Sequence, residues 1–339
     1  MGGRSRGMFT GLGARPAGTG AADMREAHVQ TMMALRAHTR GGPEQLVYEQ
    51  APVPEPAAGE VQIAVRAAGI TFAELTWDLS WTTREGQDRT PVIPAHEMSG
   101  QVTAAGPGVT GWAAGDEVYG LIDFARNGAA AQYVTMAAAD LAARPRSVPH
   151  EASASLPLAA LTAWQALTDY AATEPGERVL IHGGAGGVGV YAVQLAAFLG
   201  AHVTATGRDR TADFVRKLGA DEYVTAGTAG PGGLPQFDVV IDTVGGAALE
   251  ESYDLVRDGG RLVSVAAPPS QEQAAARSIH AMFFIVAPDP AELARLAELT
   301  DAGQLTPVIS QVIPLAEGRR AYESGTEARP PGKTVLAVS

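Results

Sequence analysis

The sequence predicts an α/β protein in two parts, with short strands and turns first and a doubly wound parallel sheet second. The stretch Arg178–Ala197 is the clearest signal, because an apolar run leads into a glycine cluster and then into residues that are apolar at helical spacing. From residue 33 to about 148 the pattern holds only short strands between turns. After Pro149, strands alternate with helices, which implies parallel βαβ units.

The glycine cluster fits the spacing G-x-G-x-x-G at Gly184, Gly186 and Gly189. The first glycine permits the tight turn, the second lets backbone approach a pyrophosphate, and the third lets the helix pack closely on the strand. Free N–H groups at the start of the following helix then hold the anion. Because a strand precedes the cluster and a helix follows it, we predict that this loop binds a dinucleotide.

Composition narrows the class of protein. The 339 residues suffice for two modest domains, and the net charge of −12 argues against nucleic acid or anionic membrane as a partner. There is no cysteine, which removes disulfides, thiol nucleophiles and thiolate metal ligands, and no apolar segment is long enough to span a bilayer. We therefore expect a cytoplasmic protein with a small-molecule partner.

Residues 1–31 differ from the rest of the chain, being rich in Gly, Ala and Arg without an apolar period. We expect a disordered extension or a start codon placed too early, with a targeting or interaction arm as the alternative.

The first structured part predicts an irregular all-β domain. Turns are expected at Gly106–Gly108 and Ala114–Asp116. The expected strands are 33–37, 46–48, 61–65, 99–104, 117–120 and 131–136.

The second part alternates strands with helices. Residues 151–170 are expected to be mostly helical, with a break at Pro157. The remaining expected strands are 179–181, 203–206, 222–225, 239–241, 261–265, 282–286 and 334–338, and the expected helices are 188–199, 210–218, 249–255 and 290–302.

The end of the second parallel strand predicts which dinucleotide binds. Folds that select NAD usually carry an acid there for the ribose diol, whereas this strand ends Thr206-Gly207-Arg208 and Asp209 falls beyond its tip. An arginine at this place pairs with a 2′-phosphate, so we predict NADP, with Arg208 as the main contact and Arg210 as a second. Ligands lie outside the carboxyl ends of such strands. We therefore also expect cofactor contacts from Thr206, Val244, Val265 and Ala266.

Several motifs in a fixed order resemble the medium-chain dehydrogenase/reductase superfamily, and within it the zinc-independent quinone oxidoreductases, the ζ-crystallin-like branch. The matching elements are Gly42-Pro-Glu44, Gly59-Glu-Val61, Ala68-Gly-Ile70, Gly106-Pro-Gly-Val109, Gly115-Asp-Glu-Val118-Tyr-Gly120, residues 156–164, the glycine loop, Leu218-Gly-Ala-Asp221 and Gly332-Lys-Thr-Val-Leu336. The resemblance spans roughly residues 33–338.

The resemblance implies a GroES-like domain, 32–152, wrapped around an inserted Rossmann domain, 153–288, with residues 289–339 returning to the first domain. The cofactor would lie in the cleft between the domains, with Thr162 under the nicotinamide. The further cofactor contacts that we expect are Ala185, Gly187 and Val188 of the loop, together with Phe284, Val286 and Lys333. A homodimer would form through the strand 282–286, unless that strand is covered within one chain.

Zinc-containing relatives place a Cys, a His followed by Glu, and a second Cys at the metal. This chain keeps His96-Glu97 but has Thr71 and Leu158 at the cysteine positions. Leucine cannot bind zinc and a threonine hydroxyl is a poor ligand, so we predict no metal and interpret His96-Glu97 as a hydrogen-bonding remnant.

The implied reaction is hydride transfer from NADPH to a quinone or to the β-carbon of an α,β-unsaturated carbonyl. Without a metal, hydrogen-bond donors must stabilise the developing oxyanion, and Thr71 is the residue we expect there. Relatives show Asn and Asp where this chain has Thr71 and Glu74, so the proton donor stays open between Tyr119 and solvent. Trp77 and Trp81 suggest a substrate wall, although either could instead fill the domain core.

Two other hypotheses remain. The first is an enoyl-thioester reductase acting on a carrier-bound chain, although the sequence shows no clear basic run for docking a carrier. The second is a non-catalytic NADPH-binding sensor or structural protein, which only a test of turnover separates from a reductase.

Overall fold

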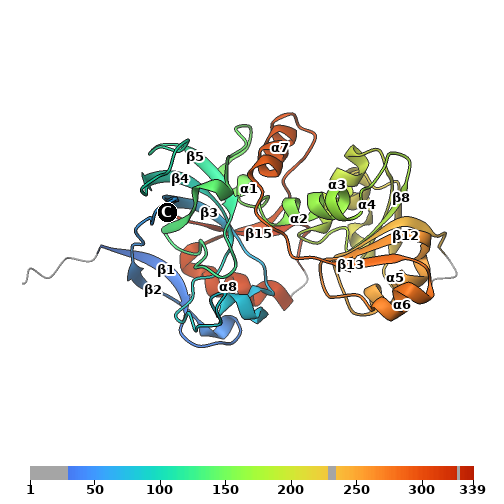
Figure 1. Cartoon of the computed structure of the whole chain (residues 1–339), viewed down its shortest axis with the longest axis horizontal. Coiled ribbons are helices and arrows are strands. Elements are labelled where there is room, and N and C mark those ends of the chain that lie inside the picture. Colours follow the sequence, from blue (N-terminus) through green and yellow to red (C-terminus); the bar gives the residue numbers. More distant parts are fainter. Residues whose placement is uncertain (1–29, 228–233, 327–328) are drawn as a thin grey trace, which may run out of the picture.

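The computed structural model describes residues 30–227, 234–326 and 329–339, and most of the extension expected at 1–31 lies outside this part of the chain. Figure 1 shows two lobes joined through α2 and by the segment that leads into α7. The first strand begins at Thr31.

The first lobe is built around β3, whose alternating residues bury Val61, Ile63 and Val65 on one face. Among the described residues its main sheet runs β14-β15-β3-β4-β5-β7, and β6 also pairs with β3. The strands are β3 (Glu60–Gly69), β4 (Glu97–Ala105), β5 (Glu117–Leu121), β6 (Tyr133–Ala137), β7 (Leu141–Ala143), β14 (Ile309–Pro314) and β15 (Lys333–Ala337). A hairpin of β1 (Thr31–Ala37) and β2 (Leu46–Pro52) lies beside it.

The second lobe is a doubly wound parallel sheet with the order β10-β9-β8-β11-β12-β13 in the described chain. Its strands are β8 (Arg178–His182), β9 (His202–Gly207), β10 (Glu222–Thr225), β11 (Phe237–Asp242), β12 (Val256–Ser264) and β13 (His280–Phe283). Strand order reverses between β8 and β11, which is where such sheets bind ligands.

Helices cover both faces of this sheet, with α3 and α4 on one side and α5 and α6 on the other (Figure 1). The helices of the described chain are α1 (His150–Ser153), α2 (Ala159–Gln165), α3 (Gly189–Phe198), α4 (Ala212–Lys217), α5 (Ala247–Leu255), α6 (Gln271–Ala276), α7 (Pro290–Asp301) and α8 (Gly318–Glu323). The break expected at Pro157 separates α1 from α2.

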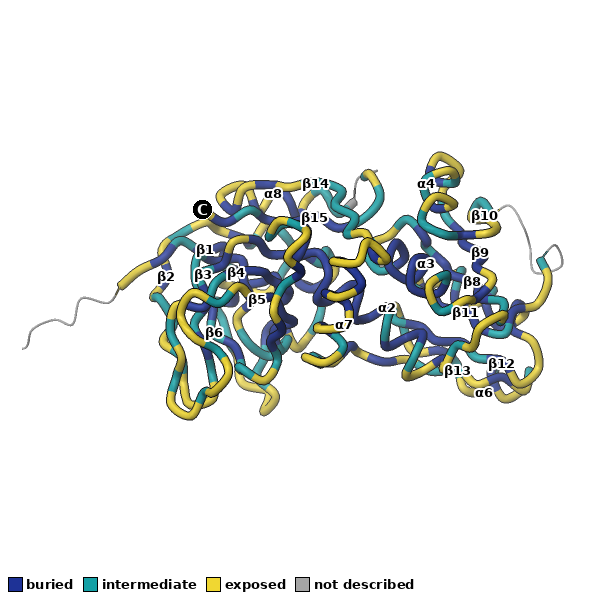
Figure 2. Tube along the Cα trace, turned by 90° about the horizontal axis from the view of Figure 1, so that it is seen from above, coloured by how far each residue is buried: buried dark blue, intermediate teal, exposed yellow. Residues whose placement is uncertain are grey.

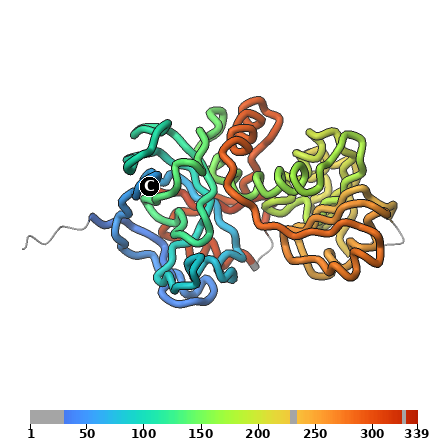
Figure 3. Tube along the Cα trace, viewed as in Figure 1, coloured from blue at the N-terminus to red at the C-terminus, as the bar shows by residue number. Residues whose placement is uncertain are grey.

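The chain returns to its first lobe at the end. β15 pairs antiparallel with β3, so the last strand lies among strands from the first third of the sequence (Figure 3). The fold class that the family resemblance implies, a GroES-like domain and a parallel Rossmann sheet, is confirmed.

One apolar core joins the two lobes. Tyr119 and Leu121 of β5 belong to the same buried cluster as Val179 and Ile181 of β8, with α2, α3 and α7 supplying the residues between. Figure 2 shows this continuity as buried segments that run through the centre of the molecule. Because packed cores resist deformation, the position of one lobe on the other is set by this cluster.

The structure also contains elements that the sequence pattern did not predict, namely β7, α6, β14 and α8. Each has six residues or fewer, too short to show a clear period. The strand expected at 282–286 is corrected as well, since β13 ends at Phe283. No helix in the described ranges is long and apolar enough to cross a membrane.

Candidate active site

The glycines of the turn after β8 serve different structural purposes: one adopts a left-handed conformation, two allow close packing, and two face the cavity. Gly183 has φ 78°, a left-handed conformation that other residues rarely adopt. A Cβ on Gly189 would lie 2.0 Å from the Gly183 carbonyl oxygen, so this position admits no side chain. Gly184 packs against Ala205, where a Cβ would approach the neighbouring methyl to 2.9 Å. Gly184 and Gly189 therefore shape the loop from behind, while Gly186 and Gly187 face the cavity.

A cavity of about 710 Å³ lies in front of this loop, between the two lobes. Of the expected cofactor residues, those lining it are Ala185, Gly186, Gly187, Val188, Thr206, Arg208, Arg210, Val244 and Lys333. Thr71, the expected oxyanion donor, lines it from the first lobe. Residues that sequence reasoning missed also line it, including His182, Gly183, Thr243, Glu251 and Arg329.

Three arginines gather at the β9 end of the cavity. Arg208 and Arg210 follow β9, and Arg329 arrives from the segment between α8 and β15. The Arg329 guanidinium lies 3.7 Å from the centre of the Phe72 ring, and its buried Nε has no hydrogen-bond partner among the described residues. Burial lowers the pKa of Arg329, and the charge of Arg208 lowers it further. The two cations thus repel each other, which makes this end of the cavity suited to an anion.

Lys333, which lines the cavity from β15, forms a buried ion pair with Glu97. Lys333 Nζ lies 2.6 Å from Glu97 Oε1, and both side chains are almost fully buried. The same ammonium donates to the Ile70 carbonyl oxygen at 2.8 Å and to Thr71 Oγ1 at 3.3 Å. Glu97 Oε2 accepts from the Leu158 backbone N–H at 2.8 Å, so the pair ties β15 to β4 and to the start of α2. Removing one member of such a pair costs roughly 3–5 kcal/mol, because the other charge is left uncompensated.

The expectation that Tyr119 could donate the proton is corrected, because its hydroxyl does not reach the cavity. Its side chain is fully buried, its hydroxyl donates to the Leu293 carbonyl oxygen of α7, and burial raises its pKa well above the ordinary value. It does not line the cavity, because β5 directs it into the core shared by the two lobes.

Trp77 and Trp81, which were expected to form a substrate wall, do not line the cavity. Trp81 is buried in the core of the first lobe, where its Nε1 donates to the Leu75 carbonyl oxygen at 2.9 Å, so it is not a substrate wall. Trp77 is half-buried and packs edge-on against Phe124, with ring centres 5.3 Å apart. It does not line the cavity within the described ranges.

Five further expected contacts do not reach the cavity. Thr162 is buried and donates to the Leu158 carbonyl oxygen, and Phe284 and Val286 are buried in the core, with Phe284 stacked on Tyr170. Val265 and Ala266 follow β12 and do not line the cavity. These five predictions failed for the same reason. The sequence pattern predicted that each residue lies at or near a strand end or in a helix, but it did not predict the direction in which the side chain points.

Two known protein families match parts of this chain. The family described as alcohol dehydrogenase GroES-like domain matches residues 57–146, and the family described as zinc-binding dehydrogenase matches residues 199–336. A probable zinc-binding oxidoreductase, mitochondrial, from Arthroderma benhamiae is 32% identical over 85% of this chain and 91% of its own length. The solved quinone oxidoreductase from Coxiella burnetii superposes with a TM-score of 0.84 at 29% identity, covering 91% of this chain and 100% of that one.

The chain belongs to the medium-chain dehydrogenase/reductase superfamily, in its quinone oxidoreductase-like branch. This confirms the family that the motifs indicated, and the family is one of oxidoreductases. Polyketide synthase GfsB from Streptomyces halstedii is 36% identical over 83% of this chain and 5% of that much longer protein.

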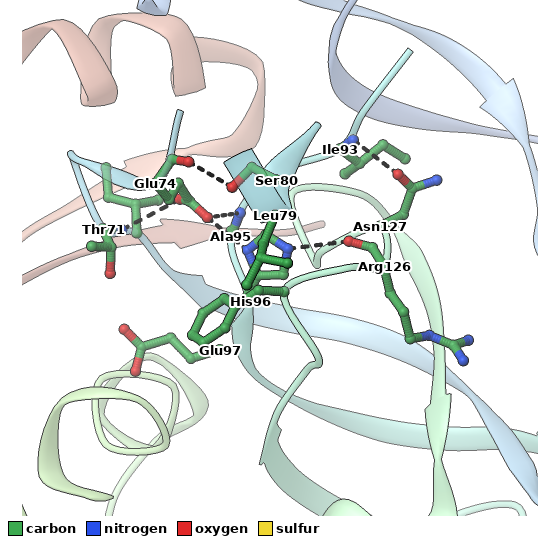
Figure 4. A network of polar contacts seen from close by, with 12 residues as sticks. Thr71, Glu74, Leu79, Ser80, Ile93, Ala95, His96, Glu97, Arg126 and Asn127 are labelled. Atoms are coloured by element: carbon green, nitrogen blue, oxygen red, sulfur yellow. Dashed lines mark hydrogen bonds and ion pairs between the residues drawn. The ribbon is translucent and has the colours of Figure 1, made fainter. Parts of the chain in front are cut away.

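The zinc in the family description does not fit the residues at the corresponding place. His96 Nδ1 lies 2.8 Å from Glu74 Oε2 and Nε2 lies 3.1 Å from the Arg126 carbonyl oxygen (Figure 4). Both ring nitrogens are thus directed at protein oxygens rather than at an open metal position. Glu97 is held by Lys333, and no group of three His, Cys, Asp or Glu in the described chain could hold a metal ion.

The hydrogen-bond network around His96 instead joins four segments of the chain, which contain Glu74, Ala95 with His96, Arg126, and Tyr322. Glu74 accepts hydrogen bonds from the Ala95 backbone N–H at 2.9 Å, from His96 and from the Tyr322 hydroxyl of α8. Glu74, His96 and Tyr322 are all buried. The carboxylate therefore fastens the loop after β3 to the residues before β4 and to the returning C-terminal segment (Figure 4).

Proposed function

We propose that this protein is an NADPH-dependent reductase that transfers hydride to a quinone or to an α,β-unsaturated carbonyl. The observation that carries the proposal is that one cavity is lined by a glycine turn, by three arginines, and by Lys333 and Thr71, which contact each other. This cavity of about 710 Å³, lined by residues of both lobes, has room for a dinucleotide.

The cofactor fits the residues present. Gly187 faces the cavity at a place where a Cβ would lie 2.9 Å from Lys333 Cδ, so the loop and the lysine stem form one narrow cradle for a diphosphate. Arg208, Arg210 and Arg329 supply positive charge where a 2′-phosphate would lie. When bound, NADPH supplies the hydride.

Thr71 is the residue that we assign to the developing oxyanion. An ammonium only donates hydrogen bonds, so the Lys333–Thr71 contact makes Thr71 Oγ1 the acceptor and leaves its own hydrogen free to donate into the cavity. Because Tyr119 lies outside the cavity, we propose that water delivers the proton that follows.

Titration of the protein with NADPH and NADH, followed by fluorescence, tests the cofactor assignment. We expect NADPH to bind more tightly, and we expect some member of a panel of quinones and enones to oxidise it, measured as loss of absorbance. Preference for NADH would show that the interpretation of Arg208 is wrong. Tight NADPH binding without turnover would instead favour the non-catalytic sensor.

An enoyl-thioester reductase is the second candidate, because a polyketide synthase contains a region similar to most of this chain. The two candidates differ in the substrate that they prefer. Faster turnover of an enoyl-pantetheine thioester than of its free enone or oxygen-ester counterpart would favour the thioester reductase, and the reverse order would favour the first proposal.

A further inference from the structure

The cavity extends along one face of α5, beyond the strand tips. Ala247, Ala248, Glu251 and Leu255 line it from this helix, and their spacing places them on one side of it. Val224 and Leu234 line the opposite wall. This part of the cavity is therefore an apolar slot with a single carboxylate, the only acidic side chain among the described residues that line the cavity.

His182 forms a second polar group in the slot. It ends β8 with a side chain that is 5% exposed, and its Nδ1 lies 3.0 Å from Thr206 Oγ1. Its Nε2 is buried and has no hydrogen-bond partner among the described residues. Burial lowers the pKa of His182, whereas the nearby carboxylates of Asp242 and Glu251 act to raise it. His182 is thus a largely desolvated imidazole with one ring nitrogen unused.

The carboxylates of Asp242 and Glu251 differ in their hydrogen-bond partners. Asp242 is fully buried and accepts hydrogen bonds from the backbone N–H groups of Val244 and Gly245 and from the Ser264 hydroxyl. Glu251 makes no hydrogen bond or ion pair with any residue in the described ranges, and it faces the cavity. Asp242 is therefore structural, and Glu251 is available to a ligand.

A free carboxylate is unfavourable in a site for an anionic cofactor unless the ligand donates a hydrogen bond to it. Of the parts of a dinucleotide, the flat purine base is the one that suits an apolar slot lined by one carboxylate. An adenine offers an exocyclic amino group as donor and ring nitrogens as acceptors, whereas a 6-oxopurine has a carbonyl oxygen in place of that amino group and carries a hydrogen on N1.

We infer that Glu251 and His182 read the base of the cofactor and select adenine over 6-oxopurines, with Glu251 accepting from the amino group and His182 Nε2 available to a ring nitrogen. This inference rests on the proposed NADPH function and adds to it the residues that determine specificity for the base.

Binding of reduced nicotinamide hypoxanthine dinucleotide phosphate, compared with NADPH, tests it without any substrate. Fluorescence titration should show the hypoxanthine cofactor binding about tenfold more weakly to the wild-type protein. In Glu251→Gln the amide both donates and accepts, so the ratio of the two dissociation constants should fall close to one. Glu250→Gln is the matched control, because Glu250 is an exposed neighbour on α5 that bonds Gln273 and does not line the cavity.

The results of this experiment distinguish a failure of the proposed NADPH-dependent function from a failure of the proposed selectivity for the base. Failure of the wild-type protein to bind NADPH would overturn the proposed function. Tight NADPH binding with equal affinity for the hypoxanthine cofactor would overturn only the role of Glu251 and His182. An unchanged preference in Glu251→Gln, with the thermal unfolding midpoint preserved, would likewise exclude Glu251 as the group that reads the base.

Discussion

Thr71 presents a hydroxyl whose oxygen accepts a hydrogen bond from Lys333. Thr71→Val keeps the shape of the side chain but removes the hydroxyl. We expect kcat/KM to fall about 10²–10³-fold, as on loss of an oxyanion donor, while the dissociation constant for NADPH stays the same. Thr71→Ser should keep most of the activity. A loss of NADPH affinity in Thr71→Val, equal to its loss of activity, would show a binding role instead.

Arg329 is the residue that sequence reasoning missed at the arginine cluster. Arg329→Leu and Arg208→Ala should each weaken NADPH binding about tenfold or more and leave NADH binding nearly unchanged, because only NADPH carries the 2′-phosphate. Their effects should be less than additive, since the two guanidiniums are close enough to repel each other. Isothermal titration of both nucleotides against the single and double variants measures this. Equal losses for NADH and NADPH would place these arginines at the diphosphate.

At the scale of elements, the turn between β8 and α3 separates glycines that shape the fold from those that admit a ligand. Gly189→Ala places a Cβ 2.0 Å from the Gly183 carbonyl oxygen. We expect a loss of about 1–3 kcal/mol in stability, measured by denaturant unfolding. At Gly186 the nearest atom would be 3.1 Å from the new Cβ, and the residue faces the cavity.

Gly186→Ala is therefore the matched comparison. It should weaken NADPH binding more than it lowers the unfolding midpoint. If both variants lost stability equally and bound NADPH equally, this division of roles within the loop would be wrong.

At the scale of the whole molecule, β13 is an edge strand of the parallel sheet in the described chain. Phe283 and Ile285 are exposed beside it, at 37% and 57%. An uncovered edge with exposed apolar side chains favours pairing with another chain, so the homodimer stays our proposal. Sedimentation should give a dimer for the wild-type protein and a monomer for Ile285→Lys. The exposed Val47→Lys, on β2 of the other lobe, should remain dimeric. A monomeric wild-type protein would exclude this assembly.

The fold class, the family and the glycine loop could be predicted from the amino-acid sequence alone. Each depends on local patterns: apolar periodicity between Arg178 and Ala197, turn glycines, and motifs in order along the chain. The arginines after β9 were predictable for the same reason, since a strand tip has a defined place in a parallel sheet. Short elements such as β7 and α6 carry too few residues to show a period.

Which side chains share the cavity depends on how the two lobes pack, and it could not be predicted from the sequence. Tyr119 and Trp81 enter cores because neighbouring elements cover them, and no sequence pattern states which elements those are. Arg329 and Lys333 reach the cavity because β15 pairs with β3, a strand more than 260 residues earlier. Glu251 faces the same cavity from a helix on the opposite lobe. Contacts between residues so distant in sequence depend on how the lobes pack, which periodicity and spacing do not encode.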